Sequence, residues 1–380
     1  METDLRFLRF DVRISDVDGG TPYRLATLEE EGWAMRKYSL AAAVASLVIF
    51  GMSFPAPRWG VANLYSLRLP FGVWRRATLQ PILRPKGHGF ESAGVFNPAV
   101  VRNAGRIVML YRAQNRQGIS SLGFATSADG LHFKARAKPV FFAQADYERG
   151  GGVEDPRIVK IDGTFYMTYT GYHNESRAGA AHHDAQLCLA TSPDLIHWTR
   201  HGVIMPAYKG AWNVGWTKSG AILDKRINGR YWMYYLGDAK GQGSQMGVAS
   251  STGLLDWKDA LDHPVLSSRP GKFDSRVVEP GPPPILLKDG ILLIYNGTDD
   301  HLVYSTGWVL FDRQNPTRVL ARASKPIFTP QTPWEKNGQT PNVVFVEGMV
   351  RKGGKWFFYY GGADKYIGAA EADVQNISSP

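Results

Sequence analysis

Residues 149–172 read RGGGVEDPRIVKIDGTFYMTYTGY and hold one complete copy of a pattern that recurs along the chain. Two runs of apolar and aromatic residues flank Asp162-Gly163, a pair typical of the tight turn in a β-hairpin. Similar pairs that punctuate other apolar runs are Asp129-Gly130, Asn228-Gly229 and Asp289-Gly290. The stretch therefore predicts a strand–turn–strand unit that the chain uses repeatedly.

The repeat is marked by a tyrosine near the end of one apolar run in each copy. The five tyrosines recur about every 60 residues: Tyr111, Tyr169, Tyr235, Tyr295 and Tyr360. A second motif falls between them, as GFATSADGLHF from Gly123, CLATSPDLIHW from Cys188 and GVASSTGLLDW from Gly247. Five such copies predict an all-β fold, a five-bladed β-propeller, in which the inner strands meet at one axial pocket.

The N-terminal part lacks the repeat and contains a short apolar segment. Positive residues precede an apolar run, Ser39 to Met52, and small residues with Pro55 and Pro57 follow it, which is the order of a secretory signal. We therefore expect a periplasmic or secreted protein, cytoplasmic if residues 35–56 are not a signal, with no stable membrane insertion after processing. The predicted divisions are an extension with a possibly non-native start (1–34), the signal-like segment (35–56), a linker and approach strand (57–84) and the propeller (85–380).

Composition narrows the classes of partner. Hydrophobic residues make up 44% and aromatic residues 12%, as in an ordered globular protein, and the net charge is +10. That charge fits either a soluble basic protein or one attracted to an acidic glycan or membrane surface. No basic run with interleaved aromatics is present, so we expect no nucleic-acid partner. The single cysteine, Cys188, lies in a repeated strand and is interpreted as a core residue.

Neither a cofactor nor a metal is predicted. The chain has no phosphate-binding glycine loop of the nucleotide type and no GxSxG motif. The histidines His173, His182 and His183, with Asp184, match no strong ligand spacing, so a polar loop is the preferred interpretation.

Acidic residues recur at one phase of the repeat, at or beside the ends of the apolar runs. They are Asp155, Asp238, Glu279 and Asp364. Each alone fits a solvated turn, but strands that radiate from one axis would bring several of them together. Hydrolysis of a glycoside needs two carboxyl groups, one as acid and one as base or nucleophile. Asn97 and Arg112 hold related positions in the first copy and suit hydrogen bonds to sugar hydroxyls.

Tryptophans supply a second class of candidate. Trp212, Trp216 and Trp334 are each compatible with stacking on a sugar face or with packing in the core. The sequence pattern does not separate these two roles.

Taken together, VFNPAVV, YRA, SLGFATSADGLHF, RGGGVEDPRI, EPGPPPI and YYGGAD resemble family 130 of the glycoside hydrolases over roughly residues 85 to 375. The resemblance implies a five-bladed propeller that acts on β-mannosides, either as a phosphorylase or as a mannosidase. It also implies that mannose is held by Asn97, Arg112, Asp155 and Asp364. In the phosphorylase branch the aspartate that matches Asp155 donates a proton through a sugar hydroxyl.

The same resemblance favours the hydrolytic branch, because positively charged positions are missing. Where phosphorylases of the family carry an arginine, this chain has Leu236, and where they carry a lysine followed by Ile-Gly it reads Val277-Val278-Glu279. A buried phosphate without cationic partners is costly, and a carboxylate there would repel it and could deprotonate water.

We therefore predict an inverting exo-mannosidase, with β-1,2 linkages favoured. Glu279 and Asp238 would be the acid and the base, roughly 6.5–9.5 Å apart, and Asp155 would hold the mannose hydroxyls. Which carboxylate is the acid is left open. The resemblance implies that hydrolytic members of the family carry glutamate at the position of Asp238, and aspartate is one methylene shorter.

Three alternatives remain. The first is a β-mannoside phosphorylase in which Lys218 or Arg276 holds inorganic phosphate, and Lys218 is also a candidate for binding substrate. The second is a non-catalytic glycan-binding propeller. The third is an arabinan- or xylan-cleaving propeller, which the EDPR and GPPPI motifs disfavour. The expected partner is a mannose-containing oligosaccharide, and the oligomeric state is left open.

Overall fold

The computed structural model describes residues 69–177, 180–208, 212–239 and 241–375, with no account of the side chains of residues 175–183. The predicted extension (1–34) and signal-like segment (35–56) lie outside the described residues. The side chains of His182 and His183 are likewise not described. Within the described part of the chain, no helix combines the length and apolarity needed to cross a membrane.

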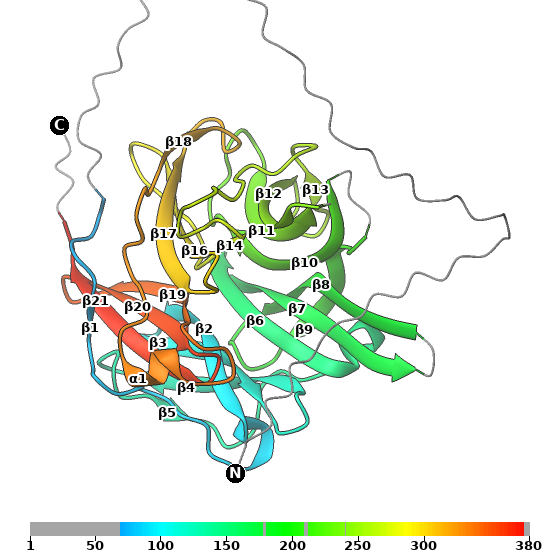
Figure 1. Cartoon of the computed structure of the whole chain (residues 1–380), viewed down its shortest axis with the longest axis vertical. Helices are drawn as coiled ribbons and strands as arrows, with labels where there is room; N and C mark the ends of the chain where they lie inside the picture. The colour runs from blue at the N-terminus through cyan, green and yellow to red at the C-terminus, as the bar shows by residue number, and fades with distance from the viewer. Residues whose placement is uncertain (1–68, 178–179, 209–211, 240, 376–380) are drawn as a thin grey trace, which may run out of the picture. The chain divides into compact units, whose positions relative to one another are not determined.

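Almost every described element is a β-strand, and consecutive strands form antiparallel groups (Figure 1). The first group comprises β2 (Gly94–Asn103), β3 (Arg106–Gln114), β4 (Ser120–Ser127) and β5 (Lys134–Ala135). The second comprises β6 (Gly150–Ile161), β7 (Thr164–Arg177), β8 (Ala180–Ser192) and β9 (Thr199–Met205). These two groups join through a single parallel bridge between Ser120 and Gly152.

Three further groups follow in chain order. The third comprises β10 (Asn213–Ile222), β11 (Tyr231–Ala239), β12 (Gly243–Ser251) and β13 (Lys258–Asp259). The fourth comprises β14 (Val277–Pro280), β15 (Ile285–Leu286), β16 (Ile291–Thr298), β17 (Tyr304–Phe311) and β18 (Val319–Arg322). The fifth comprises β19 (Val344–Lys352), β20 (Lys355–Gly362) and β21 (Tyr366–Asp373).

The fifth group is completed by a strand from the start of the described chain. β1 (Arg75–Arg76) pairs antiparallel with β21, and Figure 1 shows the two side by side. The segment predicted as an approach strand thus adds the outer strand of the last sheet.

The first strands of the groups contact one another in sequence order. β2 contacts β6, β6 contacts β10, β10 contacts β14, and β19 contacts β2. The fourth and fifth groups meet where Asn296 Nδ2 donates to the carbonyl oxygen of Val346 at 3.0 Å. The nearly all-β fold is thus confirmed, and this order of contacts is the one that a five-bladed propeller requires. The closed propeller itself stays a prediction.

Tight turns account for the hairpins. Asp162 and Gly163 connect β6 to β7 with φ of +48° and +85°, the left-handed conformation that a two-residue hairpin turn requires. Asn228 and Gly229, before β11, have φ of +51° and +76°. Glycine accepts this conformation without steric cost, and Asp and Asn tolerate it better than other residues.

The five repeated tyrosines are fully buried, and each donates its hydroxyl to a carboxylate. The pairs are Tyr111–Glu91, Tyr169–Glu148, Tyr235–Asp259, Tyr295–Asp274 and Tyr360–Glu335. We call these the tyrosine anchors. Each partner sits in a segment outside the tyrosine's own hairpin, so the bond fixes that segment to the sheet. Because a buried hydroxyl without a partner is costly, the anchors explain how polar tyrosines occupy the core.

Three of the anchoring carboxylates lie in the few short helical turns of the described chain. Glu91 is in η1 (Gly89–Glu91), Glu148 in η2 (Asp146–Glu148) and Glu335 in α1 (Pro333–Lys336). Glu335 Oε2 also accepts bonds from the backbone N–H groups of Gln331 and Thr332 at 2.7 and 2.9 Å. The glutamate thus satisfies donors at the start of its own turn, as in a capping box, while it binds the tyrosine.

Aliphatic and aromatic side chains fill the spaces between neighbouring sheets. One cluster joins Leu110 of β3 to Met167 and Cys188 of β7 and β8. Cys188 is buried and unpaired among the described residues, as a core cysteine should be. The candidate site lies at a different place, where polar residues occur along the first strand of each group.

Candidate functional site

One polar residue occurs at the same place in the first strand of every group, directly before a proline or glycine. The pairs are Asn97-Pro98, Asp155-Pro156, Ser219-Gly220, Glu279-Pro280 and Glu347-Gly348. In β2, β6, β10 and β19 the pairing register shifts at this point, and β14 ends one residue after Glu279. We call these five the bulge residues. A bulge turns a side chain out of the regular alternation of a strand, which aims it toward a site.

Asn97 and Asp155 are the bulge residues of the first two groups and contact each other directly. Asn97 Nδ2 donates to Asp155 Oδ1 at 2.7 Å, and both residues are buried. Their φ angles are +47° and +50°, conformations that Asn and Asp adopt more readily than other non-glycine residues. Asn97 Oδ1 is buried with no hydrogen-bond partner among the described residues. It can therefore accept a bond from a ligand.

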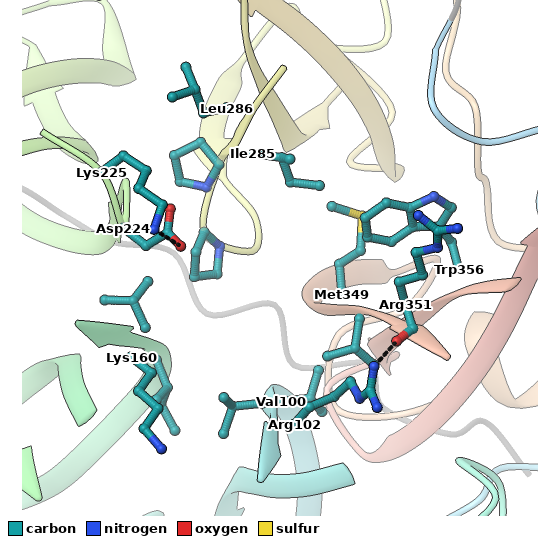
Figure 2. A pocket seen from close by; sticks show the side chains of 16 residues that line it. Val100, Arg102, Lys160, Asp224, Lys225, Ile285, Leu286, Met349, Arg351 and Trp356 are labelled. Atoms are coloured by element: carbon teal, nitrogen blue, oxygen red, sulfur yellow. Dashed lines mark hydrogen bonds and ion pairs between the residues drawn. The ribbon is translucent and has the colours of Figure 1, made fainter. Parts of the chain in front are cut away.

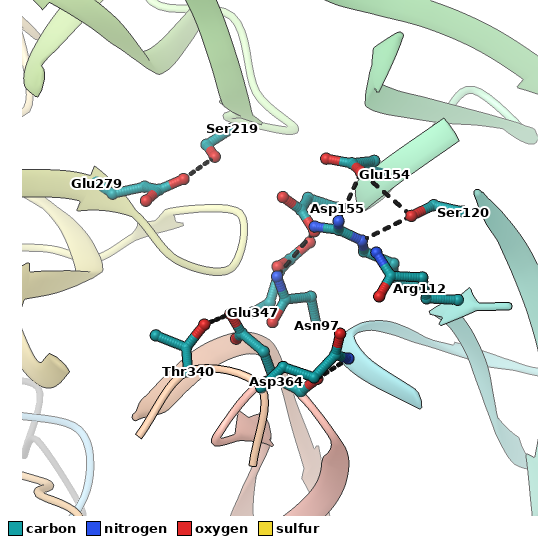
Figure 3. A network of polar contacts seen from close by, with 12 residues as sticks. Asn97, Arg112, Ser120, Glu154, Asp155, Ser219, Glu279, Thr340, Glu347 and Asp364 are labelled. Carbon is teal, nitrogen blue, oxygen red and sulfur yellow. Dashed lines mark hydrogen bonds and ion pairs between the residues drawn. The ribbon is translucent and has the colours of Figure 1, made fainter. Parts of the chain in front are cut away.

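Arg112 of β3 lies between two carboxylates (Figure 3). Its Nη1 is 3.2 Å from Asp155 Oδ1, and its Nη2 is 2.5 Å from Glu154 Oε1. Burial would raise the pKa of Asp155, but Arg112, Lys218 and the Asn97 hydrogen bond together hold it below its ordinary value. Burial raises the pKa of Glu154 despite Arg112. The surroundings therefore favour the ionised form of Asp155 more strongly than that of Glu154.

Glu279 lies in the same pocket, on the side of β10 and β14. It is 8% exposed and accepts a hydrogen bond from the hydroxyl of Ser219 (Figure 3). Burial raises its pKa, while Arg157 and the Ser219 hydrogen bond partly offset that effect. A carboxyl group with a raised pKa can exchange a proton nearer neutral pH than an ordinary glutamate.

Asp364, two residues after the end of β20, is the third acidic side chain that lines the pocket. Its Oδ2 accepts a hydrogen bond from Thr340 Oγ1 at 2.6 Å, and burial raises its pKa. Its φ is +51°, so its backbone, like that of Asn97 and Asp155, is left-handed.

These side chains line a cavity of about 280 Å³. Six of the predicted site residues are among the lining residues: Asn97, Arg112, Asp155, Lys218, Glu279 and Asp364. The lining also includes residues that sequence reasoning did not place there: Ser244, Tyr304, Thr340, Val343 and Phe345. Equivalent positions in the other copies of the repeat do not share a residue type with them, so the sequence gives no signal for these five residues.

Asp238 occupies a different position from the other predicted carboxylates. It is half-buried in β11 and is not among the residues that line the cavity, although its cross-strand partner Ser244 is. Leu236, two residues earlier on the same strand, also lines the cavity. Asp238 therefore lies next to lining residues but outside the lining itself, a position that we call the rim, and burial raises its pKa.

The three candidate tryptophans separate clearly. Trp216 is 38% exposed and lines the cavity, with Lys218 Nζ 5.0 Å from its ring centroid. Trp212 and Trp334 are buried in hydrophobic clusters, and Trp334 Nε1 donates to the carbonyl of Leu79 at 3.0 Å. Only Trp216 of these three has a face available to a ligand.

A larger cavity of about 650 Å³ lies further along the same first strands (Figure 2). Its lining combines apolar side chains with exposed cations, and Asp224 is its one acidic side chain among the described residues. It lacks a pair of carboxylates, so the smaller cavity is the candidate active site.

Comparisons with known proteins identify the family. The chain matches the Glyco_hydro_130 family, described as beta-1,4-mannooligosaccharide phosphorylase, over residues 79–379. It is 38% identical to a 1,2-beta-oligomannan phosphorylase of Thermoanaerobacter sp., over 80% of this chain and 98% of that protein. It is 31% identical to a beta-1,2-mannobiose phosphorylase of Listeria innocua, over 68% of each.

Solved structures give the same architecture. One concerns the family of mannoside phosphorylases and its glycoside hydrolases that target beta-1,2 mannosidic linkages in Candida mannan. It matches with a TM-score of 0.71 and 34% identity, over 81% of this chain and 97% of that one. A putative glycoside hydrolase of Parabacteroides distasonis matches with a TM-score of 0.70 and 35% identity, over 80% and 97%.

Proposed function

Since the chain belongs to glycoside hydrolase family 130, we propose that it cleaves β-mannosides in the cavity lined by Asp155 and Glu279. The mannosyl group to be transferred lies against Asn97, Arg112, Asp155 and Asp364. The orphaned Asn97 Oδ1 and the ionised Asp155 supply acceptors for sugar hydroxyls, and Arg112 supplies donors. β-1,2 linkages are the proposed substrate, because the two relatives named above act on β-1,2-linked mannosides by their descriptions.

The second substrate is either phosphate or water. The relatives and the charge of the cavity favour different answers. The curated relatives are phosphorylases, and they favour the phosphorylase alternative over the hydrolase that the sequence predicts. One similar solved structure supports hydrolysis instead, because its description names glycoside hydrolases of the family that target beta-1,2 mannosidic linkages.

The charge of the cavity is the observation that supports water. Its lining holds two cationic side chains, Arg112 and Lys218, against three acidic ones, and Arg112 is already paired with Glu154 and Asp155. Leu236 and Val277, which stand where the resemblance expects cations, line the cavity as apolar residues. Arg276 is exposed and is not a lining residue. A phosphate dianion would meet one lysine and an excess of negative charge there.

We therefore take hydrolysis as the function that the geometry supports best. Glu279 would remove a proton from water, the water oxygen would attack the anomeric carbon, and the bond to the leaving oxygen would break with inversion. Asp238, at the rim with a raised pKa, is the proposed donor of a proton to the leaving oxygen. Phosphorolysis is the second candidate, with Lys218 as the cation nearest to an incoming phosphate.

One assay separates the two candidates. The purified protein is given β-1,2-mannobiose with and without inorganic phosphate, and the products are identified. Hydrolysis gives two mannose molecules at a rate that phosphate does not raise. Phosphorolysis gives mannose 1-phosphate and requires phosphate. Binding of mannobiose without turnover in either buffer would point instead to a glycan-binding protein.

A further inference from the structure

The arginine of the EDPR motif has no assigned part in the reaction, yet it is among the most completely buried side chains of the described chain. Arg157 is 2% exposed and lies in β6, two residues after Asp155. It does not line the active-site cavity. A buried guanidinium is retained only where its donors and its charge are satisfied, so its partners show what it does.

Those partners lie on β6 itself, at the end of β14 and on β19. Arg157 Nε donates to the carbonyl oxygen of Gly281 at 2.9 Å, and Nη2 donates to that of Pro280 at 2.7 Å. Nη1 donates to the carbonyl oxygen of Asp155 at 3.2 Å and lies 3.3 Å from Glu347 Oε1. The guanidinium therefore connects the backbone of Asp155, the two residues that follow Glu279, and the bulge residue of the fifth group.

The segment after Glu279 is held tightly on its other side as well. A Cβ atom at Gly281 would lie 2.7 Å from the carbonyl oxygen of Val346 and 2.8 Å from that of Ile294, so only glycine fits there. Pro280 fixes its own φ and donates no backbone hydrogen bond. The backbone directly after Glu279 therefore has little conformational freedom, and the carbonyl oxygens of Pro280 and Gly281 both bind Arg157.

We propose that Arg157 is the positioning residue of the active site: it fixes Glu279 relative to Asp155 by binding the carbonyl oxygens of Asp155 and of Pro280 and Gly281, the two residues that follow Glu279. This inference rests on the proposed cleavage of β-mannosides. Catalytic groups must be held within about 0.5 Å of their working geometry, and a shift of about 1 Å can cost about 100-fold in rate. A planar fork with five donors can bind three carbonyls and a carboxylate together, whereas lysine has three donors and no fork.

The test compares Arg157→Lys and Arg157→Met with the wild-type protein on β-1,2-mannobiose. The control is Arg200→Lys, because Arg200 also binds several partners, Glu148 at 2.9 Å and Gln144 at 2.7 Å among them, and lies outside the cavity. Each variant is measured for kcat, KM, thermal midpoint and the pH profile of kcat/KM.

Positioning predicts a specific split between these measurements. Arg157→Lys should lower kcat about 10- to 100-fold with KM changed less than about threefold, because the chemistry loses alignment while sugar binding is kept. Arg200→Lys should lower the thermal midpoint and leave kcat unchanged. If Arg157→Lys behaves as Arg200→Lys does, Arg157 is only structural and the proposal is wrong.

The pH profile gives a second readout that a merely structural role would not move. The charged and titratable groups that act on Glu279 or are acted on by it are Arg157, Lys218, Asp155, Glu347 and Tyr304. Arg157→Met removes the first of these, so the acid limb of the profile should move to higher pH. Arg157→Lys keeps the charge and should leave the limb in place. If the acid limb of kcat/KM does not move in Arg157→Met, Arg157 does not act directly on Glu279.

A third variant covers the case in which Arg157→Met does not fold. Glu347→Gln keeps the size of the side chain and weakens one contact of Arg157, so kcat should fall several-fold while the fold survives. An unchanged kcat would overturn the proposal. If the wild-type protein itself cleaves no β-mannoside, the proposed function fails first, and the two failures are thereby distinguished.

Discussion

Asn97 Nδ2 donates to Asp155 Oδ1 at 2.7 Å, although the two residues are 58 positions apart in the sequence. Both are bulge residues of their groups, and both have a left-handed backbone. Ser219 and Glu279, the next two bulge residues, are joined in the same way by a hydrogen bond. Neighbouring repeats thus meet through equivalent positions, and the active-site cavity is assembled from one position used several times.

Replacing Glu279 tests its role as the group that activates the nucleophile. Glu279→Gln keeps the volume and can still accept the Ser219 hydrogen bond, but it cannot take a proton from water. We expect turnover of β-1,2-mannobiose to fall about 10²- to 10⁴-fold, with an unchanged thermal midpoint. A variant with the full wild-type rate would remove Glu279 from the reaction.

Asp238 is tested separately, because it stands at the rim rather than in the lining. Asp238→Asn should lower kcat about 100-fold or more if it protonates the leaving oxygen. Substrates with a leaving group that needs no proton, such as an aryl mannoside with an acidic phenol, should be affected far less. A similar loss on both substrates would mean that Asp238 acts in some other way.

Ser219→Ala should change the pH dependence of activity. Burial raises the pKa of Glu279, and the Ser219 hydrogen bond lowers it in part. Without that bond the pKa rises further, so the basic carboxylate is lost at a higher pH. The acid limb of kcat/KM should therefore move upward in pH. Ser251→Ala is the matched control, since Ser251 is also buried and binds only local backbone N–H groups of its turn; its limb should not move.

Trp216→Ala tests whether the exposed indole contacts the sugar. We expect KM for mannobiose to rise about 2- to 10-fold, with kcat changed much less, because a stacking face contributes about 0.5–1.5 kcal/mol to binding. Val214, on the same strand, is 40% exposed and is not a lining residue, so Val214→Ala should leave KM unchanged. Equal KM values for the two variants would show that Trp216 does not bind substrate.

The tyrosine anchors predict an effect on stability without an effect on chemistry. Tyr360→Phe leaves Glu335 bound to Arg76 and to two backbone N–H groups but removes a buried hydrogen bond of 2.8 Å. The free energy of unfolding should fall by about 1–2 kcal/mol, measured by denaturant unfolding, while kcat stays unchanged. Tyr166→Phe, at a partly buried tyrosine of β7, should cost less. A loss no larger than that of the control would mean that the anchors are not stabilising.

The repeat was readable from the sequence because its strongest signals are local. Aromatic runs ending at Tyr169 and its equivalents, together with turn pairs such as Asp162-Gly163, predicted the strands and hairpins that the structure contains. Asn97, Asp155 and Glu279 were also found, since each lies in a motif whose proline stands out.

Other residues in or beside the cavity could not be found this way. Ser219 and Glu347 precede glycine rather than proline, so the repeated position was not recognised in those two copies. Tyr304 and Thr340 reach the cavity from segments outside the first strands, and only packing brings them there. The partners of Arg157 are mostly backbone carbonyls, which have no sequence signature at all.

The tyrosine anchors bind segments outside their own hairpins, whereas three of the five bulge residues, Asn97, Asp155 and Glu279, line the cavity, and no anchor residue belongs to the cavity lining as described. The residues that stabilise the sheets and the residues that line the cavity therefore occupy different positions of each repeat. Evolution can exchange a serine, an asparagine or a glutamate at a cavity position without loosening the scaffold. One scaffold can in this way serve different co-substrates, and the relatives of this chain include both phosphorylases and hydrolases by their descriptions.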